Sequence, residues 1–406
     1  MINRIKQYDW KKYNFSLLCV VIVLCLIGAF CVKLAGGEAK GAALMKGQIT
    51  GLVMGIVILV VLSVFDYHFI CHFTPLYYVA GILLTAATHS PLGRDNDTGV
   101  YRWVKLGPIS FQPTELMKII LILTLASLYT KLKSKVDRTS TLFIAVVIAM
   151  VPVAVILIQP DLSSSLVAVF ITIVLVFAAG TAYKILVPII ALGIPAGVVL
   201  FWYVQQPDNV ILRGYQYKRI YAWLHPGDPS ADDLNFQQNL CIRAIASGKL
   251  YGKFIQDGGS GNETRVYSTP LPVSESDFIW SIVGEEFGFL GCCLILLLFA
   301  IIIFKCFSVA KKAQDFLGSM IALGVAAMFM FQVFANICVA TRLFPNTGLP
   351  LPFLSNGLSS MLSSMIGIGF VMNIGIQPAK TSNSGFTMRS EFGSDNTKNI
   401  DMDLEL

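Results

Sequence analysis

Charge is what this 406-residue sequence most lacks: only 13% of its residues are Asp, Glu, Lys or Arg, whereas 55% are hydrophobic. A soluble globular domain carries about 25% charged residues, so the composition excludes an ordinary water-soluble domain. The apolar residues come in blocks about 20 residues long, the length that crosses the ~30 Å hydrocarbon core of a bilayer. The sequence therefore predicts a protein that crosses a membrane several times.

Three further absences narrow the class of protein. The sequence has no continuous basic stripe with interleaved aromatic residues, and its formal net charge is only +6, so nucleic acid is not an expected partner. Nine cysteines occur, but they form no CxxC pair, which argues against a disulfide framework and a CxxC metal site. The four histidines are scattered; His68 and His72, four residues apart, fit a metal-binding pair or, more simply, two solvated imidazoles in a short loop.

Ten apolar segments can be marked along the chain. They lie near residues 14–33, 47–65, 72–90, 115–130, 141–158, 164–181, 185–204, 279–304, 316–339 and 356–377. The first follows a basic stretch as a signal peptide does, but it is too long and lacks a clear cleavage site, so we expect a retained helix. The predicted fold is an all-α, polytopic membrane protein with about ten transmembrane helices. Its transmembrane domain spans 1–380, and a polar tail at 381–406 is expected to be disordered in the cytoplasm.

The placement of lysine and arginine predicts the orientation of the chain. With the N-terminus inside, the inner segments hold 15 of these residues, the short outer segments hold eight, and the long loop between helices seven and eight, about 205–278, holds seven. Cytoplasmic loops are rich in Lys and Arg, and loops above ~60 residues count little, so both termini are expected in the cytoplasm. The polar outward segments then locate function on the extracytoplasmic face. These segments are 91–114, 159–163, 205–278 and 340–355.

The segment Phe111–Lys118 brings ionisable residues into an apolar block. Pro113 suits the first turn of a helix, and Glu115 and Lys118 are then i,i+3 neighbours on one face. Ionisable side chains within a membrane span are costly, and they usually face a bundle interior or a wet cavity. Two interpretations stay open: a buried pair that only fixes helix packing, or a cation presented to an anionic substrate near the outer surface.

Just upstream, Arg102 and Trp103 stand between two glycines, Gly99 and Gly107. The planar guanidinium of Arg102 suits phosphate, and Trp103 can stack on a sugar. The same pair is also typical of the membrane interface, where a tryptophan anchors the chain and an arginine reaches toward water.

An acidic residue, Asp277, marks the mouth of the eighth predicted helix. Small residues follow it on nearly the same helical face, which lets another helix approach closely and would place Asp277 in a groove between helices. These residues are Ser281, Gly284, Gly288 and Gly291. Desolvation in such a groove raises the pKa of a carboxylate, which suits a general base. An N-cap role for the same aspartate fits the spacing equally well.

The two largest outer loops carry cations, glycines and prolines. Arg213 and Arg219 in the long loop fit binding of a phosphate-bearing headgroup, and they also fit a plain structured loop. Residues 346–357 are rich in proline and glycine at a helix entrance. Broken backbone at membrane depth is tolerated only where it is buried in protein or lines a cavity.

Taken in order, these stretches resemble the SEDS family (shape, elongation, division and sporulation), to which RodA, FtsW and SpoVE belong. The matching stretches are Arg102-Trp103, Phe111 to Glu115 with Lys118, Gln159 to Leu162, Arg219 to Pro229, Ala244 to Lys253, Ser276 to Ile279 with Gly284 to Phe289, and Thr347 to Gly357 with Ser359 and Ser360. Their order is kept from about residue 100 to 375, which makes the set specific. The sequence departs from the family pattern at Ser163-Ser164, where Gly-Thr is usual, and at Asn356 to Leu358, where Tyr-Gly-Gly is common.

The resemblance implies a peptidoglycan glycosyltransferase in the cytoplasmic membrane of a bacterium. Such enzymes polymerise lipid II, the undecaprenyl-diphosphate-linked disaccharide peptide, outside the membrane and work with a class B penicillin-binding protein. In that family the aspartate matching Asp277 is tied most closely to activity, and the positions matching Trp103, Glu115 and Lys118 line the central cavity. Roles in elongation, division and sporulation all stay open.

Lipid II carries its sugar on an α-linked diphosphate and the polymer is β-linked, so a single inverting displacement suffices. Our hypothesis assigns the general base to Asp277. The leaving diphosphate is bound by cations, namely Arg102, Lys118 and Arg213 or Arg219. A divalent cation, Mg²⁺ or Mn²⁺, bridging Asp277 and the diphosphate is an alternative that no ligand cluster in the sequence requires. Two rival functions are a flippase or transporter of the lipid-linked precursor, which the ionisable pair near the membrane would serve as well, and a non-catalytic scaffold for the penicillin-binding protein.

Overall fold

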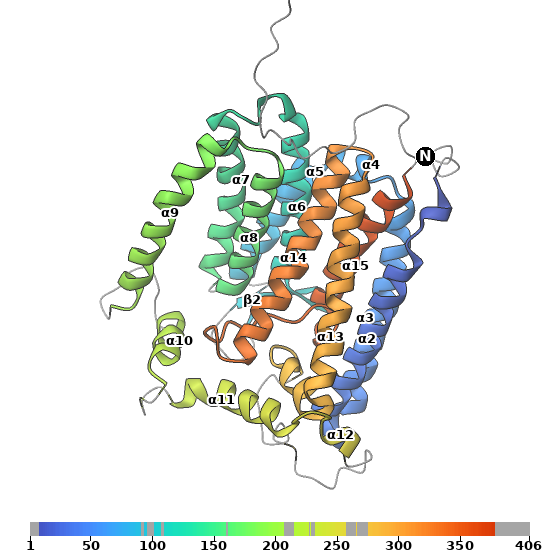
Figure 1. Cartoon of the computed structure of the whole chain (residues 1–406), viewed down its shortest axis with the longest axis vertical. Coiled ribbons are helices and arrows are strands. Elements are labelled where there is room, and N and C mark those ends of the chain that lie inside the picture. Colours follow the sequence, from blue (N-terminus) through green and yellow to red (C-terminus); the bar gives the residue numbers. More distant parts are fainter. Residues whose placement is uncertain are drawn as a thin grey trace, which may run out of the picture.

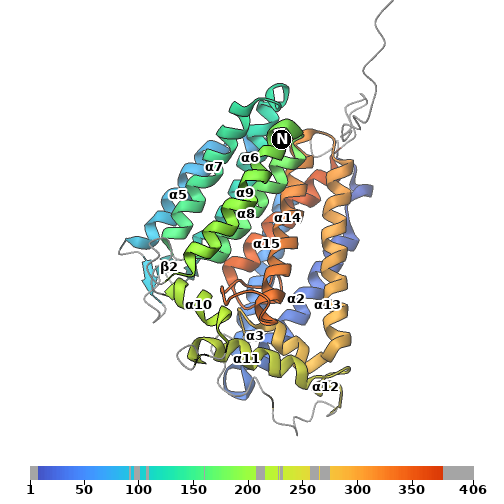
Figure 2. The same cartoon turned by 60° about the vertical axis from the view of Figure 1, so that its left-hand side comes forward.

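Long helices that run roughly along one direction make up most of the chain, with shorter helices and a small sheet gathered at one end (Figures 1 and 2). The computed structural model describes residues 8–90, 93–95, 101–106, 109–159, 161–206, 215–226, 228, 232–256, 265 and 275–377. The tail expected to be disordered, 381–406, lies outside the described residues.

Eight of the described helices are long and apolar enough to cross a membrane. They are α2 (Phe15–Ala35), α3 (Gly37–Val64), α6 (Pro113–Lys131), α7 (Thr139–Ile158), α9 (Tyr183–Val204), α13 (Ile279–Lys312), α14 (Phe316–Ala340) and α15 (Leu358–Ile376). Two shorter apolar helices, α5 (Thr74–Ala86) and α8 (Leu162–Ala178), correspond to the other expected segments. The predicted class, an all-α polytopic membrane protein, is confirmed, while the number of membrane crossings stays a prediction.

The outer surface of the bundle is apolar, as a protein dissolved in lipid requires. Helix α7 contains no charged residue, and its Phe143 side chain is 68% exposed. Helix α9 exposes even more apolar surface than α7. Its Leu192 side chain is 75% exposed, and Figure 1 shows the helix at the left edge of the bundle, apart from the other helices. In water such surfaces would be an aggregation liability, whereas lipid tails solvate them.

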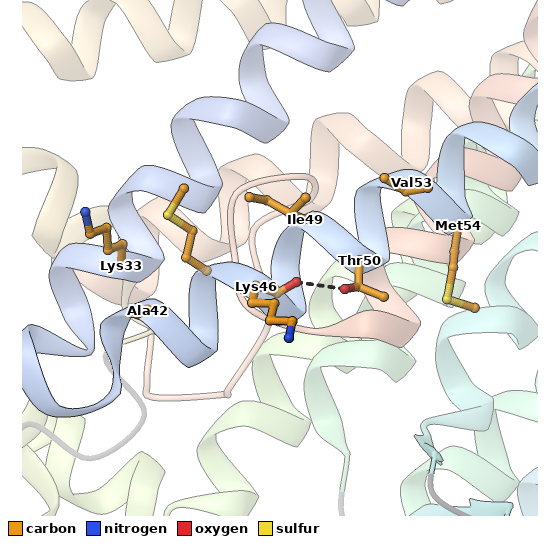
Figure 3. Close-up of a pocket in the computed structure, with 8 residues that line it drawn as sticks. Lys33, Ala42, Lys46, Ile49, Thr50, Val53 and Met54 are labelled. Carbon is orange, nitrogen blue, oxygen red and sulfur yellow. Dashed lines mark hydrogen bonds between the residues drawn. The ribbon is translucent and has the colours of Figure 1, made fainter.

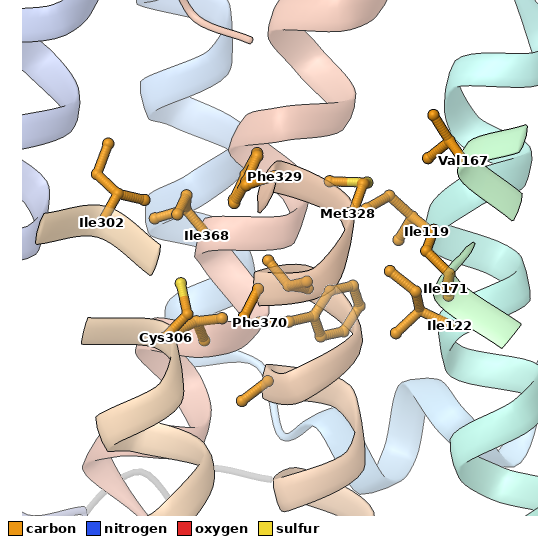
Figure 4. Packing of buried hydrophobic residues seen from close by; sticks show 14 of the residues in the cluster. Ile119, Ile122, Val167, Ile171, Ile302, Cys306, Met328, Phe329, Ile368 and Phe370 are labelled. Carbon is orange, nitrogen blue, oxygen red and sulfur yellow. The ribbon is translucent and has the colours of Figure 1, made fainter. Parts of the chain in front are cut away.

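The interior is packed by side chains from several helices. Figure 4 shows part of this core, in which Ile119 and Ile122 of α6 lie near Val167 and Ile171 of α8, and Phe329 of α14 lies beside the neighbouring helices. The cysteines behave as small apolar residues, since most of them are buried and all nine are free. Packing of this kind sets where the polar loops at the helix ends meet.

One end of the bundle carries the elements that position the candidate site. A three-stranded antiparallel sheet, β1 (Gly93–Asp95), β2 (Tyr101–Leu106) and β3 (Ile109–Phe111), leads directly into α6. The long loop folds into α10 (Tyr215–Leu224), α11 (Asp232–Ser247) and α12 (Lys253–Gln256), and α11 lies crosswise under the bundle (Figure 1). An all-α fold predicts no strands here, and β-favouring Tyr, Trp and Val in β2 account for them.

The expected third segment, 72–90, is divided in the structure. A six-residue helix, α4 (Tyr67–His72), precedes α5, and a 3-10 turn, η2 (Ala87–His89), follows it. Two further 3-10 turns are η1 (Trp10–Lys12) and η3 (Lys133–Lys135).

The expectation of two solvated imidazoles was wrong for His68. Its Nδ1 lies 2.8 Å from Asp66 Oδ1 and its Nε2 lies 2.5 Å from Asp315 Oδ2. Both ring nitrogens therefore face carboxylates, and this clamp ties α4 to the residue that caps the start of α14.

Candidate functional site

Asp277 lies in a tight turn immediately before α13 and is only partly exposed. The turn is anchored by the next two side chains, because Phe278 is 1% exposed and Ile279 is fully buried. Phe278, not Asp277, occupies the N-cap position, and no side chain caps the helix. The N-cap interpretation of Asp277 was therefore wrong.

The two carboxylate oxygens of Asp277 have different surroundings. Oδ1 accepts a hydrogen bond from Ser276 Oγ at 3.2 Å, whereas Oδ2 accepts none from any residue that the structure describes. Oδ2 instead lies against Gly348, where an added Cβ would sit 2.9 Å from it. Asp277 thus presents one oxygen that can take up a proton.

Three charged side chains from separate segments act on Asp277. Burial raises the pKa of its carboxyl, and the negative charge of Asp161 raises it further, while the Ser276 hydrogen bond and the positive charges of Arg219 and Arg102 oppose the rise. Burial prevails, so the pKa of Asp277 stays above its usual range. The structure brings together one predicted base and two predicted phosphate-binding arginines.

Arg102 and Trp103 are adjacent residues of β2, which leads through β3 into α6. Successive side chains of a strand point to opposite faces, so Trp103 faces away from Arg102. Trp103 stands opposite Arg94 of β1 in the register of the sheet. The side chain of Trp103 therefore points to the face of β2 opposite to that of Arg102, the arginine that acts on Asp277.

Arg219 comes from α10 and is held by a loop of the last helix pair. Its Nη1 donates to the carbonyl oxygen of Asn346 at 2.8 Å, and Asn346 Nδ2 donates to Gln237 Oε1 of α11 at 2.8 Å. Gln238 Nε2 donates to the carbonyl oxygens of Val339 and Phe344 at 2.8 and 2.9 Å. The long loop therefore docks on residues 339–346. Its other predicted cation, Arg213, lies outside the described residues.

Glu115 and Lys118 form the buried ion pair that the helical spacing predicts. Lys118 Nζ lies 2.8 Å from Glu115 Oε1, and the side chains are 0% and 1% exposed. Ser363 Oγ of α15 donates to Glu115 Oε2 at 3.2 Å, so the pair also joins α6 to α15.

Asp161 is a residue of this site to which the sequence alone assigned no role. It is 1% exposed and caps α8, where its Oδ1 accepts from Ser164 N at 3.1 Å and its Oδ2 from Ser164 Oγ at 2.8 Å. Gln112 Nε2, at the start of α6, also donates to Oδ2 at 3.3 Å. The sequence signal was an aspartate followed, after Leu162, by three serines at the start of an apolar block, which is typical of an N-cap.

The expected stripe of small residues on α13 faces the folded long loop. Gly288 has φ +63°, so the helix is broken there, and a Cβ on it would meet Gly252 N at 2.4 Å. Gly284 packs against Ile245 of α11. As expected, the stripe lets another helix approach at Gly284, namely α11 of the long loop, while Gly288 receives the loop residues that follow α11.

Two buried ion pairs hold the long loop on α13. Lys253 Nζ lies 2.8 Å from Glu285 Oε1, and Arg265 Nε lies 2.8 Å from Glu286 Oε1. Both glutamates are almost fully buried, so each carboxylate needs its cation.

A groove of about 490 Å³ lies elsewhere, along α3 near the end of α2 (Figure 3). It is lined by Lys33, Ala42, Met45, Lys46, Ile49, Thr50, Val53 and Met54. None of these is a predicted site residue. The groove is mainly apolar, so we do not assign the chemistry to it.

The donor set around Asp277 offers little to a metal ion. Among the residues that the structure describes, no group of three or more His, Cys, Asp or Glu side chains could hold one. Both oxygens of Asp161 already accept hydrogen bonds, which leaves Asp277 Oδ2 as the open oxygen of this carboxylate pair. A divalent cation would fit only as a bridge completed by the substrate, and it stays a prediction.

The fold and the site together define a multi-pass membrane protein with a desolvated carboxylate and two arginines gathered at one end of its helix bundle. The family model described as "Cell cycle protein", which covers FtsW, RodA and SpoVE, matches residues 9–380. The chain therefore belongs to the FtsW/RodA/SpoVE family, as its ordered motifs predicted.

Relatives of known sequence agree with this assignment. A probable peptidoglycan glycosyltransferase FtsW from Trichlorobacter lovleyi is 32% identical over 378 residues, which cover 91% of this chain and 94% of that protein. The peptidoglycan glycosyltransferase MrdB of Escherichia coli is 28% identical over 376 residues, 92% of this chain and 96% of its own. The names of these relatives agree with the predicted enzyme class.

Solved structures share the fold. One, described as structural coordination of polymerization and crosslinking by a peptidoglycan synthase complex, matches with a TM-score of 0.73 at 27% identity over 90% of this chain and 98% of that one. The crystal structure of the Thermus thermophilus rod shape determining protein RodA matches with a TM-score of 0.63 at 24% identity over the same shares, which supports the fold alone.

Proposed function

We propose that this chain is a peptidoglycan glycosyltransferase that polymerises lipid II on the outer face of the bacterial cytoplasmic membrane, with Asp277 as general base. The observation that carries the proposal is the Asp277 carboxylate, which has an open Oδ2, a raised pKa and the charges of Arg102 and Arg219 nearby. Such a group is poised between an acceptor hydroxyl and an anionic leaving group.

The proposed reaction is one inverting displacement. Asp277 takes the proton of the acceptor 4-hydroxyl while that oxygen forms a bond to the anomeric carbon of the donor sugar. The bond from the anomeric carbon to the diphosphate breaks, and its electron pair leaves with the diphosphate. Because attack comes from the opposite face, the α-linkage becomes a β-linkage without a covalent enzyme intermediate.

The cations have the task of holding the leaving diphosphate. Arg102 and Arg219 act on Asp277 from a strand and from the long loop, so both can bind oxygens of the diphosphate as it leaves the anomeric carbon. Arg213 adds a third cation in the proposal. Lys118 has three donor hydrogens, of which Glu115 engages one, and it contributes positive charge from within α6. Trp103 lies on the other face of β2 from Arg102, so a sugar that stacks on it would lie away from the Asp277 carboxylate.

A class B penicillin-binding protein is the proposed partner. A similar chain has been solved within a peptidoglycan synthase complex. The partner would crosslink the strands that this chain makes, and both active centres would then face the extracytoplasmic side.

The experiment is polymerisation of fluorescent lipid II by the purified protein, with and without a class B penicillin-binding protein, read as glycan strands on a gel. Asp277→Asn should lower the rate about 10²- to 10⁴-fold, the range of general-base catalysis. Asp228→Asn is the matched control, because Asp228 is an acidic residue of the long loop that accepts a hydrogen bond from Tyr221 Oη at 2.7 Å. The control should keep near wild-type activity.

The same experiment separates the rival functions. A flippase would move labelled lipid II across proteoliposomes without making strands, and a scaffold would make strands only through a polymerase supplied by its partner. A folded Asp277→Asn protein that polymerises normally would refute the base assignment.

A further inference from the structure

Residues 347–349 pass directly under the Asp277 carboxylate. Gly348 has φ +69°, a conformation that glycine tolerates and that strains other residues, and its Cα side faces Asp277 Oδ2. The carboxylate is therefore seated on bare backbone. Any movement of this backbone changes the position of the oxygen proposed to take the proton.

One buried amide on α14 holds both the turn that bears Asp277 and this backbone. Asn336 Nδ2 donates to the carbonyl oxygen of Asp277 at 3.0 Å and to that of Leu349 at 2.6 Å, and the side chain is 1% exposed. Because both partners are acceptors, the nitrogen of the amide must face them, and its two hydrogens can serve both at once. Asn336 thus ties the turn directly to the backbone of residues 347–349.

Ser163 holds the other end of this backbone segment less firmly. Its Oγ lies 2.9 Å from the carbonyl oxygen of Thr347 and 3.0 Å from Asp161 Oδ1. A hydroxyl has one hydrogen, so it can donate to only one of these acceptors at a time. Asn336 is consequently the stronger of the two tethers.

We propose that Asn336 is a positioning residue for Asp277, acting through the backbone carbonyls of Asp277 and Leu349. This inference rests on the proposed function, in which Asp277 is the base. Asn336 does not touch substrate; it keeps Oδ2 over Gly348 and within reach of the acceptor hydroxyl. A misplacement of about 1 Å at a reacting group can lower a rate about 100-fold.

The test compares Asn336→Ala with Asn373→Ala in the lipid II polymerisation assay. Asn373 is a matched control, because it is a fully buried asparagine of α15 whose Nδ2 donates to the Ser63 carbonyl oxygen at 2.8 Å and whose Oδ1 accepts from Tyr67 N at 3.1 Å. Both variants lose buried hydrogen bonds, so both should lower Tm. Only Asn336→Ala should lower kcat per folded molecule, by about 100-fold, with KM within a few-fold of wild type.

The pH dependence of kcat provides a second measurement, which would not change if Asn336 had only a structural role. Loosening the turn admits water to Asp277, so the acid limb of kcat should shift to lower pH in Asn336→Ala and stay in place in Asn373→Ala. The Gly348→Ala variant is an independent test, because its added methyl group would lie 2.9 Å from Asp277 Oδ2. That variant should lower kcat and displace the same limb even if Asn336→Ala fails to fold.

The outcomes distinguish the positioning role from the base assignment. Loss of activity in Asp277→Asn, together with wild-type kcat and an unmoved acid limb in Asn336→Ala, would overturn the positioning proposal and leave the base assignment standing. If Asn336→Ala does not fold, the Gly348→Ala variant decides the matter. Wild-type kcat and an unmoved acid limb of the kcat pH profile in Gly348→Ala would then overturn the positioning proposal. Normal polymerisation by Asp277→Asn would instead overturn the proposed function, and the positioning role with it.

Discussion

The buried Glu115–Lys118 pair provides the sharpest test of whether charge within α6 serves packing or substrate. The perturbations are Glu115→Gln, Lys118→Met and the double variant, which remove one charge or both while nearly keeping side-chain size. Each side chain is at most 1% exposed and the ion pair is 2.8 Å long. Neither single variant therefore leaves a charge that water can reach.

The magnitudes follow from this burial. Breaking a buried pair by removing one partner destabilises a protein by about 3–5 kcal/mol, whereas replacing both partners by groups of similar volume is often neutral. We expect each single variant to lose stability in that range. The double variant should recover most of this loss, because it leaves no buried charge and Ser363 can still donate to the amide oxygen that replaces Glu115 Oε2. Its new amide N–H group has no partner at position 118, which keeps the double variant about 1–3 kcal/mol below wild type.

The assay combines unfolding in detergent with lipid II polymerisation on the same preparations. If Lys118 helps to hold the diphosphate, the double variant should be stable and yet at least about 10-fold lower in kcat/KM, since a charge-assisted hydrogen bond is worth about 1.5–3 kcal/mol. A stable double variant with wild-type kcat/KM would refute the substrate role. The pair would then be a packing device that joins α6 to α15.

Two further predictions concern pH. Burial raises the pKa of Asp277, and a base must be deprotonated to act, so polymerisation should fall on acidification at a higher pH than an ordinary aspartate would give; a rate that stays constant down to about pH 4 would contradict this. At the opposite end of the bundle, burial lowers the pKa of His68 but its hydrogen bonds to Asp315 and Asp66 outweigh that effect and leave it raised. The stabilisation from this clamp should be fully present below the ordinary histidine pKa of about 6.5 and be lost as pH rises through the raised value. Tm measured across that range should fall in wild type and stay flat in His68→Gln.

Several features of the site were accessible from sequence because they depend on local chemistry. Pro113 followed by Glu115 and Lys118 predicts an i,i+3 pair on one helix, and the pair is present. Asp277 could be singled out because a carboxylate at the edge of an apolar block is costly. The conformation at Gly288 was not accessible, since it depends on the approach of Gly252 from another segment.

The partners of Asp277 come from distant parts of the chain. Arg102 is on a strand before α6, Asp161 caps α8, Arg219 is on α10 and Asn336 is inside α14. No local pattern relates these positions. Asn336 could be recognised in advance only as a polar residue inside an apolar block, and Asp161 only as the N-cap of a helix.

The amino-acid sequence by itself determined that this protein lies in a lipid bilayer, which segments form helices, and to which family it belongs. The first two follow because hydropathy acts over ~20 consecutive residues, and the third because the family motifs keep their order along the chain. Only the tertiary structure decided which polar groups meet. Helix packing brings four loops to one end of the bundle, and hydrogen bonds between residues far apart in sequence then set the distances on which the chemistry of Asp277 depends.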